Sequence, residues 1–279
     1  MSLWRPKSLG MGVGGGELVI VDRINSEGAH VASQLPLRDY LPGAGSPETA
    51  IWEPAVSTAL SQANKLSGRL QVSISDDWVR YWTVTPPKGL GSMLELRALA
   101  AGRFEQLFGA AAEAWHIEAD WSANRPMLAC ALPRSLVVAL NAVSSHSGCR
   151  IASVVPEAIR LINRDASQLK EDGWICCFGS HAFLALLQQR GQLLAARQFR
   201  FDLTPALPEV LAKLETEALR LGHDMPATVF LLGDAPPIVE VPGSSIKIKM
   251  PSRARPMPKA VGMERASDAF RLALHGVAA

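Results

Sequence analysis

Short runs with strand character, separated by glycine turns, open each half of the chain. In the first half these runs cover residues 8–13, 17–22 and 30–37, and in the second half they lie within 173–188 and over 192–201. Gly14, Gly15 and Gly16 supply the first turn, and Gly179 and Gly191 supply the turns of the second half. The pattern predicts a three-stranded antiparallel meander in each half. For the first run, a flexible glycine-rich leader is the alternative.

Apolar residues at helical spacing predict six helices. They cover residues 48–67, 94–108, 133–145, 156–163, 207–221 and 263–274. Further strands are predicted over 70–74, 78–85, 115–121, 126–132, 150–155, 229–232 and 245–250, and 236–258 is expected to be mainly a surface loop rich in proline and basic residues. Strands that alternate with helices in this way are typical of an α/β fold.

Length and composition favour two domains with an insert. The chain has 279 residues, of which 48% are hydrophobic and 19% are charged, so it can bury substantial cores. The proline pair 86–87 ends the first set of strands, and a helix with further strands precedes the second meander. We therefore expect a first domain over 1–87, an inserted α+β subdomain over 88–150 and a second domain over 151–279.

Charge and cysteine content exclude several classes of protein. The formal net charge is +2 and the basic residues are scattered, which argues against nucleic-acid binding. Cys130, Cys149, Cys176 and Cys177 lack the spacing of a zinc site or of a secreted disulfide framework, so reduced thiols in the cytoplasm are expected. No apolar run suits a signal peptide or a membrane span, so we expect any membrane association to come through a partner.

The residues with catalytic potential have simpler interpretations. These residues are Asp76, Asp77, Glu118, Asp120, Cys176, Cys177 and His181. Turn and solvent-face positions explain the carboxylates, a surface position explains the histidine, and adjacent cysteines on a strand point to opposite faces as small apolar residues. No catalytic or metal-binding residue is predicted. The tryptophans around the insert are expected mostly in the core, with some lining a groove for a partner segment.

Three glycine-bearing segments carry a resemblance to a known family. They are 9–20 (LGMGVGGGELVI), 174–184 (WICCFGSHAFL) and 231–235 (LLGDA). The first two resemble the phosphate segments LGIDIGSSSVKVV and LIDIGASTTKLVV of the PilM family of type IV pilus assembly proteins, and the third is similar to the family's adenosine-side glycine pair. PilM has an actin-like ATPase fold, which the cytoplasmic part of the type II secretion protein GspL shares. The resemblance implies a degenerate nucleotide cleft formed by Gly12, Gly14, Gly15, Gly16, Gly179 and Gly233.

Two departures from the family's motifs bear on catalysis. In this fold two aspartates organise magnesium and the attacking water, and Gly12 and Cys177 stand in their places. Glycine offers no ligand and a neutral thiol is a poor partner for magnesium, so the resemblance implies that hydrolysis is lost. An alternative alignment places the family's first phosphate segment on residues 19–25. It keeps an acid at Asp22 but puts Ile24 at a position where the turn needs glycine. No cofactor is expected, and ATP remains open only as a weakly bound ligand.

The resemblance implies a scaffold at the cytoplasmic face of the inner membrane. Such a protein would hold the cytoplasmic tail of a bitopic partner similar to PilN in a groove of the first domain near the insert, where an extended peptide can add to an exposed strand. The rival hypothesis is an active ATPase or small-molecule kinase of the same fold. The choice between a pilus and a type II secretion machine, and self-association of the chain, stay open.

Overall fold

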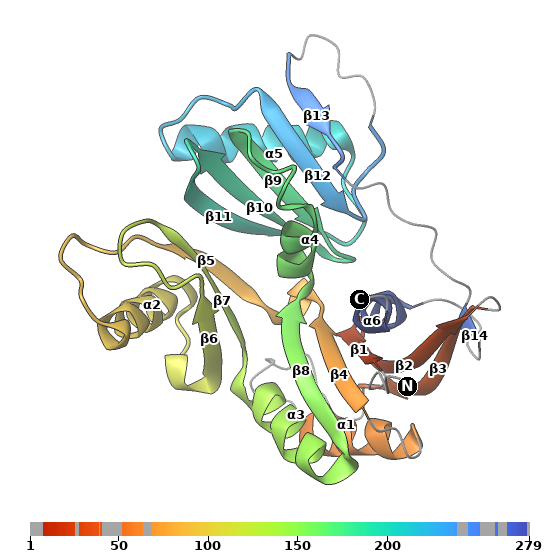
Figure 1. Cartoon of the computed structure of the whole chain (residues 1–279). Coiled ribbons are helices and arrows are strands. Elements are labelled where there is room, and N and C mark those ends of the chain that lie inside the picture. The colour runs from red at the N-terminus through yellow and green to blue at the C-terminus, as the bar shows by residue number, and fades with distance from the viewer. Residues whose placement is uncertain are drawn as a thin grey trace, which may run out of the picture.

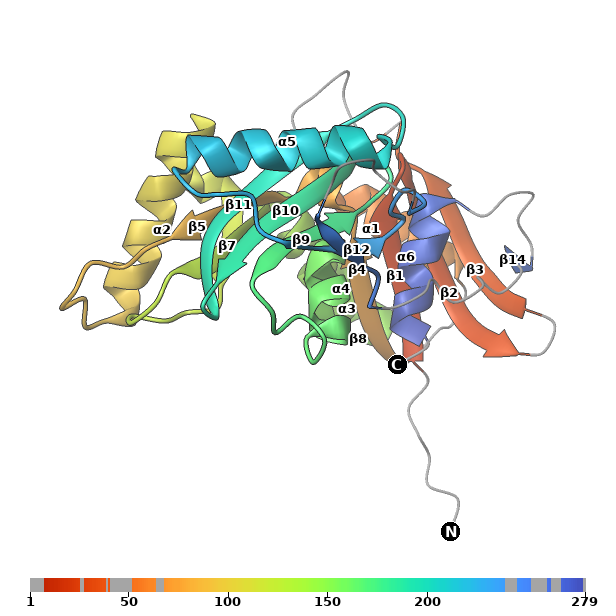
Figure 2. The same cartoon turned by 90° about the horizontal axis from the view of Figure 1, so that it is seen from above.

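Three β-sheets form the framework of the chain (Figure 1). The structure is a computed structural model, and it describes residues 8–25, 28–38, 40, 52–63, 68–238, 245–251, 260–261 and 267–277. Each of the two larger sheets forms the core of a domain, and the small third sheet lies beside the second domain (Figure 2). Parts of the predicted helices 48–67 and 263–274 and of the predicted loop 236–258 lie outside the described residues.

The first sheet has the strand order β14-β3-β2-β1-β4-β8. Its strands are β1 (Ser8–Gly14), β2 (Glu17–Asn25), β3 (Gly28–Pro36), β4 (Gly68–Ile74), β8 (Cys149–Pro156) and β14 (Ala260–Val261). The antiparallel pairing of β1, β2 and β3 confirms the predicted meander, so the alternative of a flexible leader is wrong for Ser8–Gly14. β4 and β8 extend the sheet in parallel.

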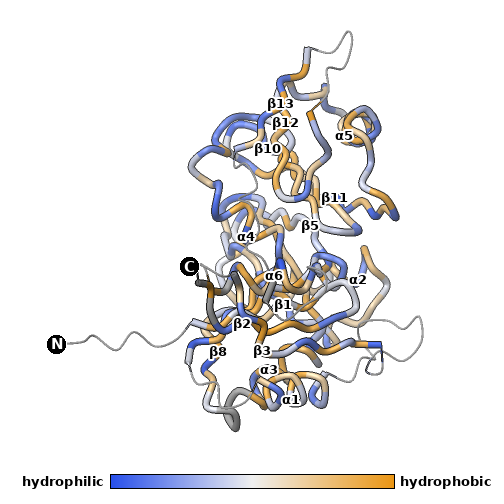
Figure 3. The backbone as a smooth tube through the Cα atoms, turned by 90° about the vertical axis from the view of Figure 1, so that its right-hand side faces the viewer, coloured by the Kyte–Doolittle hydropathy of each residue, from blue (hydrophilic) through white to orange (hydrophobic). Residues whose placement is uncertain are grey.

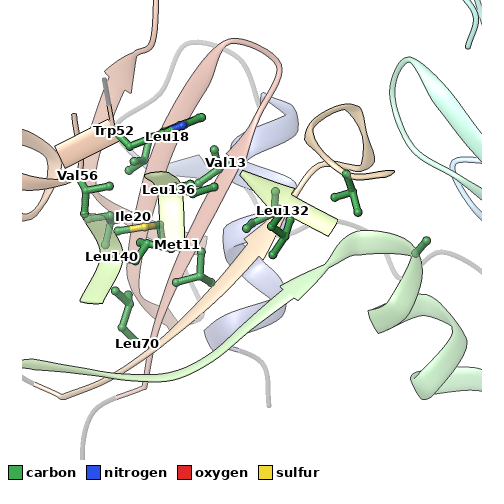
Figure 4. Close-up of a cluster of buried hydrophobic side chains, with 14 of the residues drawn as sticks. Met11, Val13, Leu18, Ile20, Trp52, Val56, Leu70, Leu132, Leu136 and Leu140 are labelled. Atoms are coloured by element: carbon green, nitrogen blue, oxygen red, sulfur yellow. The ribbon is translucent and has the colours of Figure 1, made fainter. Parts of the chain in front are cut away.

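Three helices cover this sheet. Helices α1 (Trp52–Gln62) and α3 (Arg134–Ser147) lie on one face, and α6 (Asp268–Val277) lies on the other. On the α1 and α3 side, apolar side chains of β1, β2 and β4 pack against the two helices (Figure 4). The labelled members of this cluster are Met11, Val13, Leu18, Ile20, Trp52, Val56, Leu70, Leu132, Leu136 and Leu140.

The small sheet has the order β5-β7-β6 and packs on helix α2. Its elements are β5 (Arg80–Val84), α2 (Met93–Phe108), β6 (Trp115–Ala119) and β7 (Met127–Pro133), with short 3-10 turns at Asp76–Trp78 and Ala112–Ala114. Ser92 and Glu95 form a capping box at the start of α2, and Gly109 ends the helix in the left-handed conformation. Trp82, Phe104 and Trp115 form its aromatic core.

The strand pairing at both ends of the insert differs from the expected division of the chain. β5 was expected to close the first domain before residue 87, but the turn at Asp76–Trp78 directs the chain away from β4, and β5 pairs with β7 instead. At the other end of the insert, α3 and β8 already pack with the first sheet before residue 150 is passed. The insert therefore corresponds to the small sheet with α2.

The second large sheet has the order β11-β10-β9-β12-β13. Its elements are β9 (Gly173–Phe178), β10 (Ala182–Gln189), β11 (Gln192–Arg200), α5 (Leu207–Arg220), β12 (Thr228–Gly233) and β13 (Lys247–Lys249), and the short helix α4 (Glu157–Asp165) leads into it from β8. The second predicted meander is confirmed. Helix α6 was expected in this domain, but it returns to the first sheet and covers β1 and β2.

Apolar segments of the sequence run along the strands of both large sheets (Figure 3). Cys176 and Cys177 illustrate how β9 serves two cores, because Cys177 packs in the cluster shared with the first domain and Cys176 packs against the α5 side. Both thiols are free and fully buried, which agrees with their interpretation as small apolar residues.

Alternate residues of β1 serve the two faces of the first sheet. Met11 and Val13 point toward α1 and α3, whereas Gly10 and Gly12 lie directly under α6. A Cβ built on Gly12 would lie 1.8 Å from the carbonyl oxygen of Ala269, and one on Gly10 would lie 1.7 Å from that of a residue one turn later in α6. The backbones of β1 and α6 can approach this closely only because both positions lack a side chain.

Gly12→Ala should therefore lower the free energy of unfolding by about 3 kcal/mol or more, because the added methyl group would overlap the backbone of α6. Urea denaturation measures this change. The matched control is Gly102→Ala on α2, where a Cβ meets nothing within 4 Å and where alanine should stabilise the helix by about 0.5–1 kcal/mol. A Gly12→Ala protein as stable as the wild type would show that α6 does not pack on β1 in this way.

Candidate functional site

The site lies between the two domains, where β4 ends and α4 begins, and Asp76 is its central carboxyl group. Asp76 is 2% exposed and follows β4 in the turn Asp76–Trp78. Its oxygens accept hydrogen bonds from the backbone N–H of Ala158 at 3.1 and 3.2 Å and from the hydroxyl of Tyr81. Asp76 does lie in a turn, as predicted, but the expected solvent-facing position is wrong, because the neighbouring elements bury and pair its carboxyl group.

Glu157 and Arg271 form the second part of the site. Glu157 is the first residue of α4 and is 0% exposed. Both of its carboxylate oxygens accept hydrogen bonds from the guanidinium of Arg271, with 3.1 Å between Nη2 and Oε2. Arg271 also pairs with Asp268 on its own helix and, at 3.2 Å, with Asp234 after β12. A single guanidinium thus joins α6, α4 and the second large sheet.

Further hydrogen bonds hold β11 of the second domain against this site. The side-chain amide of Gln198 donates to the carbonyl oxygen of Asp76 at 2.7 Å, and Arg200 donates to that of Asp77 at 3.5 Å. β11 consequently lies beside β5, which begins just after the turn. The same turn therefore connects the first domain, the small sheet and the second domain.

Burial controls the electrostatics of the two carboxyl groups. Burial raises the pKa of Asp76 to about 7, although the hydrogen bonds from Tyr81 and Ala158 act in the opposite direction. Burial also raises the pKa of Glu157, and Arg271 partly offsets this shift. Burial alone would lower the pKa of Arg271, but Glu157 and Asp268 raise it well above its ordinary value. The guanidinium therefore stays charged, while Asp76 exchanges its proton near neutral pH.

The structure brings most of the predicted glycines to this site. Gly14, Gly15 and Gly16 form the β1–β2 turn, and a Cβ on Gly14 would lie 2.9 Å from the carboxylate of Asp268. Gly179 lies over the two carboxyl groups, since its Cβ would be 3.3 Å from Glu157 and 4.0 Å from Asp76.

Two other predicted glycines have packing roles. Gly233 has a φ of +77° and lies against the backbone of Phe178, where a Cβ would be 2.2 Å from the carbonyl oxygen. Gly12 lies under α6, which occupies the space beside it. A side chain at position 12 would therefore meet the helix backbone before it could reach a ligand.

The other predicted positions lie as follows. Cys177 is fully buried in β9, and burial raises the pKa of its thiol well above the ordinary value. His181 is exposed, while Glu118 and Asp120 form exposed pairs with His116 and Arg125. Within the described residues, no group of three or more His, Cys, Asp or Glu side chains is arranged to hold a metal ion. Across the same part of the chain, no helix is long and apolar enough to cross a membrane.

Sequence reasoning missed Glu157 and Arg271. Glu157 stands at the start of a predicted helix, where an acidic residue is expected for the helix dipole alone. Arg271 stands within the terminal helix, and its spacing from Asp268 indicates only a local pair. The contact between Arg271 and Glu157 joins residues 114 positions apart in the chain, so no local sequence pattern predicts it.

Comparison with solved structures identifies the class: the chain has the actin-like ATPase fold. It is similar to a chain of the PilM–PilN type IV pilus biogenesis complex, with 14% sequence identity, a TM-score of 0.51 and coverage of 83% of this chain and 82% of the other. It is also similar to the cytoplasmic domain of EpsL, an inner-membrane component of the type II secretion system of Vibrio cholerae, with 12% identity, a TM-score of 0.50 and coverage of 86% and 88%.

At these identities the likeness establishes the fold. The sequence matches no model of a protein family, and it matches no curated protein. The expected actin-like ATPase fold is confirmed, and the geometry of the site is the remaining guide to function.

Asp76→Asn should make the free energy of unfolding less dependent on pH between about 4 and about 7. In the wild type the folded carboxyl keeps its proton up to a pKa of about 7, whereas the unfolded chain releases it near the ordinary value of 3.8. Stability is therefore lost as the pH rises through this window, by about 1.4 kcal/mol for each unit of pKa shift, and the loss ends above it. Urea unfolding at several pH values measures the slope.

The control for this experiment is Asp120→Asn, which removes an exposed carboxylate and should leave the slope unchanged. If the wild type and Asp76→Asn show equal slopes, Asp76 is already ionised in the folded protein and the assignment fails.

Proposed function

We propose that the chain is a cytoplasmic scaffold of a type IV pilus or type II secretion machine. In this role it captures the cytoplasmic tail of an inner-membrane partner similar to PilN and does not hydrolyse ATP. The observation that carries the proposal is that Arg271 forms ion pairs with carboxylates of this chain, so these charged groups already have partners within the protein. The fold shared with PilM and EpsL is consistent with this role.

The contents of the cleft favour binding over catalysis. The oxygens of Asp76 already accept hydrogen bonds from Tyr81 and Ala158, and Glu157 is held by Arg271. A carboxylate that organises magnesium needs free oxygens toward the ion. The two positions where this fold family uses aspartate hold Gly12, which lies under α6, and the buried thiol of Cys177.

A groove beside the small sheet supplies a place for a peptide. The groove has a volume of about 390 Å³ and lies between β6, the face of α2 that carries Arg97 and Ala101, and the start of α3. β6 is an outer strand of its sheet, and among the described strands it pairs only with β7. An extended peptide can form backbone hydrogen bonds with such a strand.

The walls of the groove combine aromatic, apolar and charged groups. Trp115 and Trp121 line it, the guanidinium of Arg97 lies 5.7 Å from the ring centre of Trp121, and the indole of Trp121 donates to Glu118 at 3.1 Å. Leu94, which is 79% exposed, lies one turn before Arg97 on the same side of α2. Large exposed apolar side chains beside an aromatic groove are typical of a protein-binding surface.

Leu94→Asp should weaken binding of the partner's cytoplasmic tail by at least about tenfold, because it replaces an exposed apolar side chain by a charge on the side of α2 that carries Arg97. Fluorescence polarisation with labelled N-terminal tails of bitopic pilus and secretion proteins measures the affinity. Leu203→Asp is the matched control, since Leu203 is 86% exposed in the second domain. Equal weakening by both variants would place the binding surface elsewhere, and failure of every tail to bind would remove the proposed function.

Calorimetry with ATP and magnesium distinguishes the scaffold from an active ATPase or kinase. We expect no micromolar binding and no release of phosphate, because Arg271 and Glu157 are paired with each other and Asp76 already accepts hydrogen bonds from Tyr81 and Ala158. Micromolar affinity with turnover would overturn the non-hydrolysing assignment.

A further inference from the structure

A second groove, distinct from the one beside β6, lies between the first turns of α1 and α3. It has a volume of about 590 Å³, and Ser57 of α1 lines it together with Ser135 and Ala139 of α3. Residues four positions apart lie one above the other on a helix, so Ser135 and Ala139 form one edge of the groove. Because these three side chains are small, the two helices leave space between their first turns.

The core of the first domain holds the walls of this groove in place. Val56 of α1 and Leu136 and Leu140 of α3 pack in the same buried cluster on the first sheet (Figure 4). Trp52, which also lines the groove, is 1% exposed, and its ring meets that of Trp78 edge-on at 5.2 Å. The spacing of the two helices is therefore set by the core, which lowers the entropy cost of binding a ligand between them.

The exposed side chains of the groove are apolar with one negative charge. Val138 is 57% exposed, and Pro54 is exposed beside it in the lining. Among the described residues that line the groove, only Glu53 is charged. It is exposed, and in the part of the chain that the structure describes no ion pair joins it to a cation. This composition is complementary to an apolar side chain that is followed by a basic one.

The two grooves meet at the start of α3. This helix packs against α1 on one side and against β6 on the other (Figure 1). Arg134, its first residue, lines the groove beside β6, and Ser135, the next residue, lines the second groove. A helix is about 10 Å wide and an extended chain spans about 3.3 Å per residue, so about four residues suffice to cross from one groove to the other.

We propose that the groove between α1 and α3 is a second binding site for the cytoplasmic tail of the partner. The tail places an apolar side chain over Val138 and a lysine or arginine beside Glu53. For the identity of the partner this inference rests on the scaffold function, whereas the chemistry of the groove does not depend on it. Two linked sites raise the affinity of the tail, because binding of one segment keeps the other at high effective concentration.

The first test uses a capped synthetic peptide of two leucines and one lysine with the full chain. The NMR signal of the indole N–H of Trp52 reports binding, and we expect a saturable shift. Val138→Gln should weaken binding by at least about threefold, because apolar contact area is lost. Leu219→Gln on α5 is the matched control, since Leu219 is 71% exposed, and it should leave the affinity unchanged.

A charge reversal tests the role of Glu53. Replacing the lysine of the peptide by glutamate should weaken binding to the wild type by about threefold, and Glu53→Lys should reverse this preference. Glu209→Lys is the matched control, because Glu209 is also an exposed acidic residue in the first turn of a helix, and it should keep the wild-type preference. Absence of a saturable shift, or an unchanged preference in Glu53→Lys, would overturn the proposal.

A second test asks whether one partner occupies both grooves. It uses labelled N-terminal tails of bitopic pilus and secretion proteins. Weakening of the same tail by Leu94→Asp and by Val138→Gln supports a shared partner. Weakening by Leu94→Asp alone overturns the shared partner and leaves the scaffold function intact. If no tail binds, the scaffold function and the shared partner both fail, while the synthetic peptide still decides whether the groove is a binding site.

Discussion

The ion pairs of Arg271 are the interactions on which the arrangement of the domains depends. Glu157 is 0% exposed, and a buried carboxylate is costly unless it is paired and hydrogen-bonded. Only Arg271 meets this need among the described side chains, and it can do so only when α6 lies across the first sheet. The close approach of α6 in turn requires glycine at position 12 of β1. One electrostatic requirement thus connects a strand near one end of the chain to a helix near the other.

The local elements could be predicted from the sequence, but the membership of the sheets could not. Glycine turns and short apolar runs were sufficient to predict both meanders, because hairpin pairing is decided within a few residues. The departure of β5 from the first sheet depends on the turn at Asp76–Trp78, and the return of α6 depends on contacts with β1. Hydrophobic periodicity describes single helices and strands, so it does not predict which distant elements pack together.

The glycine turns of the candidate site could be predicted from the sequence, but its buried charged residues could not. Glycines mark the turns at residues 14–16 and at Gly179 because the backbone there must bend or pass close to other groups. Asp76, by contrast, belongs to an Asp-Asp pair that is typical of an exposed turn. Its burial depends on the backbone N–H of Ala158, 82 positions away, and on the hydroxyl of Tyr81. The same pattern of residues would be an ordinary surface turn without α4 above it.

Closure of the cleft and presentation of the groove are mechanically related. Asp76 binds Tyr81 of β5 through its carboxyl group and Gln198 of β11 through its carbonyl oxygen. The small sheet is therefore joined to both domains through one turn, and β6 is the strand of this sheet farthest from β5. In an enzyme of this fold the cleft must open for its ligand, and the small sheet would then move with the turn. In a scaffold the same contacts favour binding, because a rigid groove loses less entropy when a peptide binds.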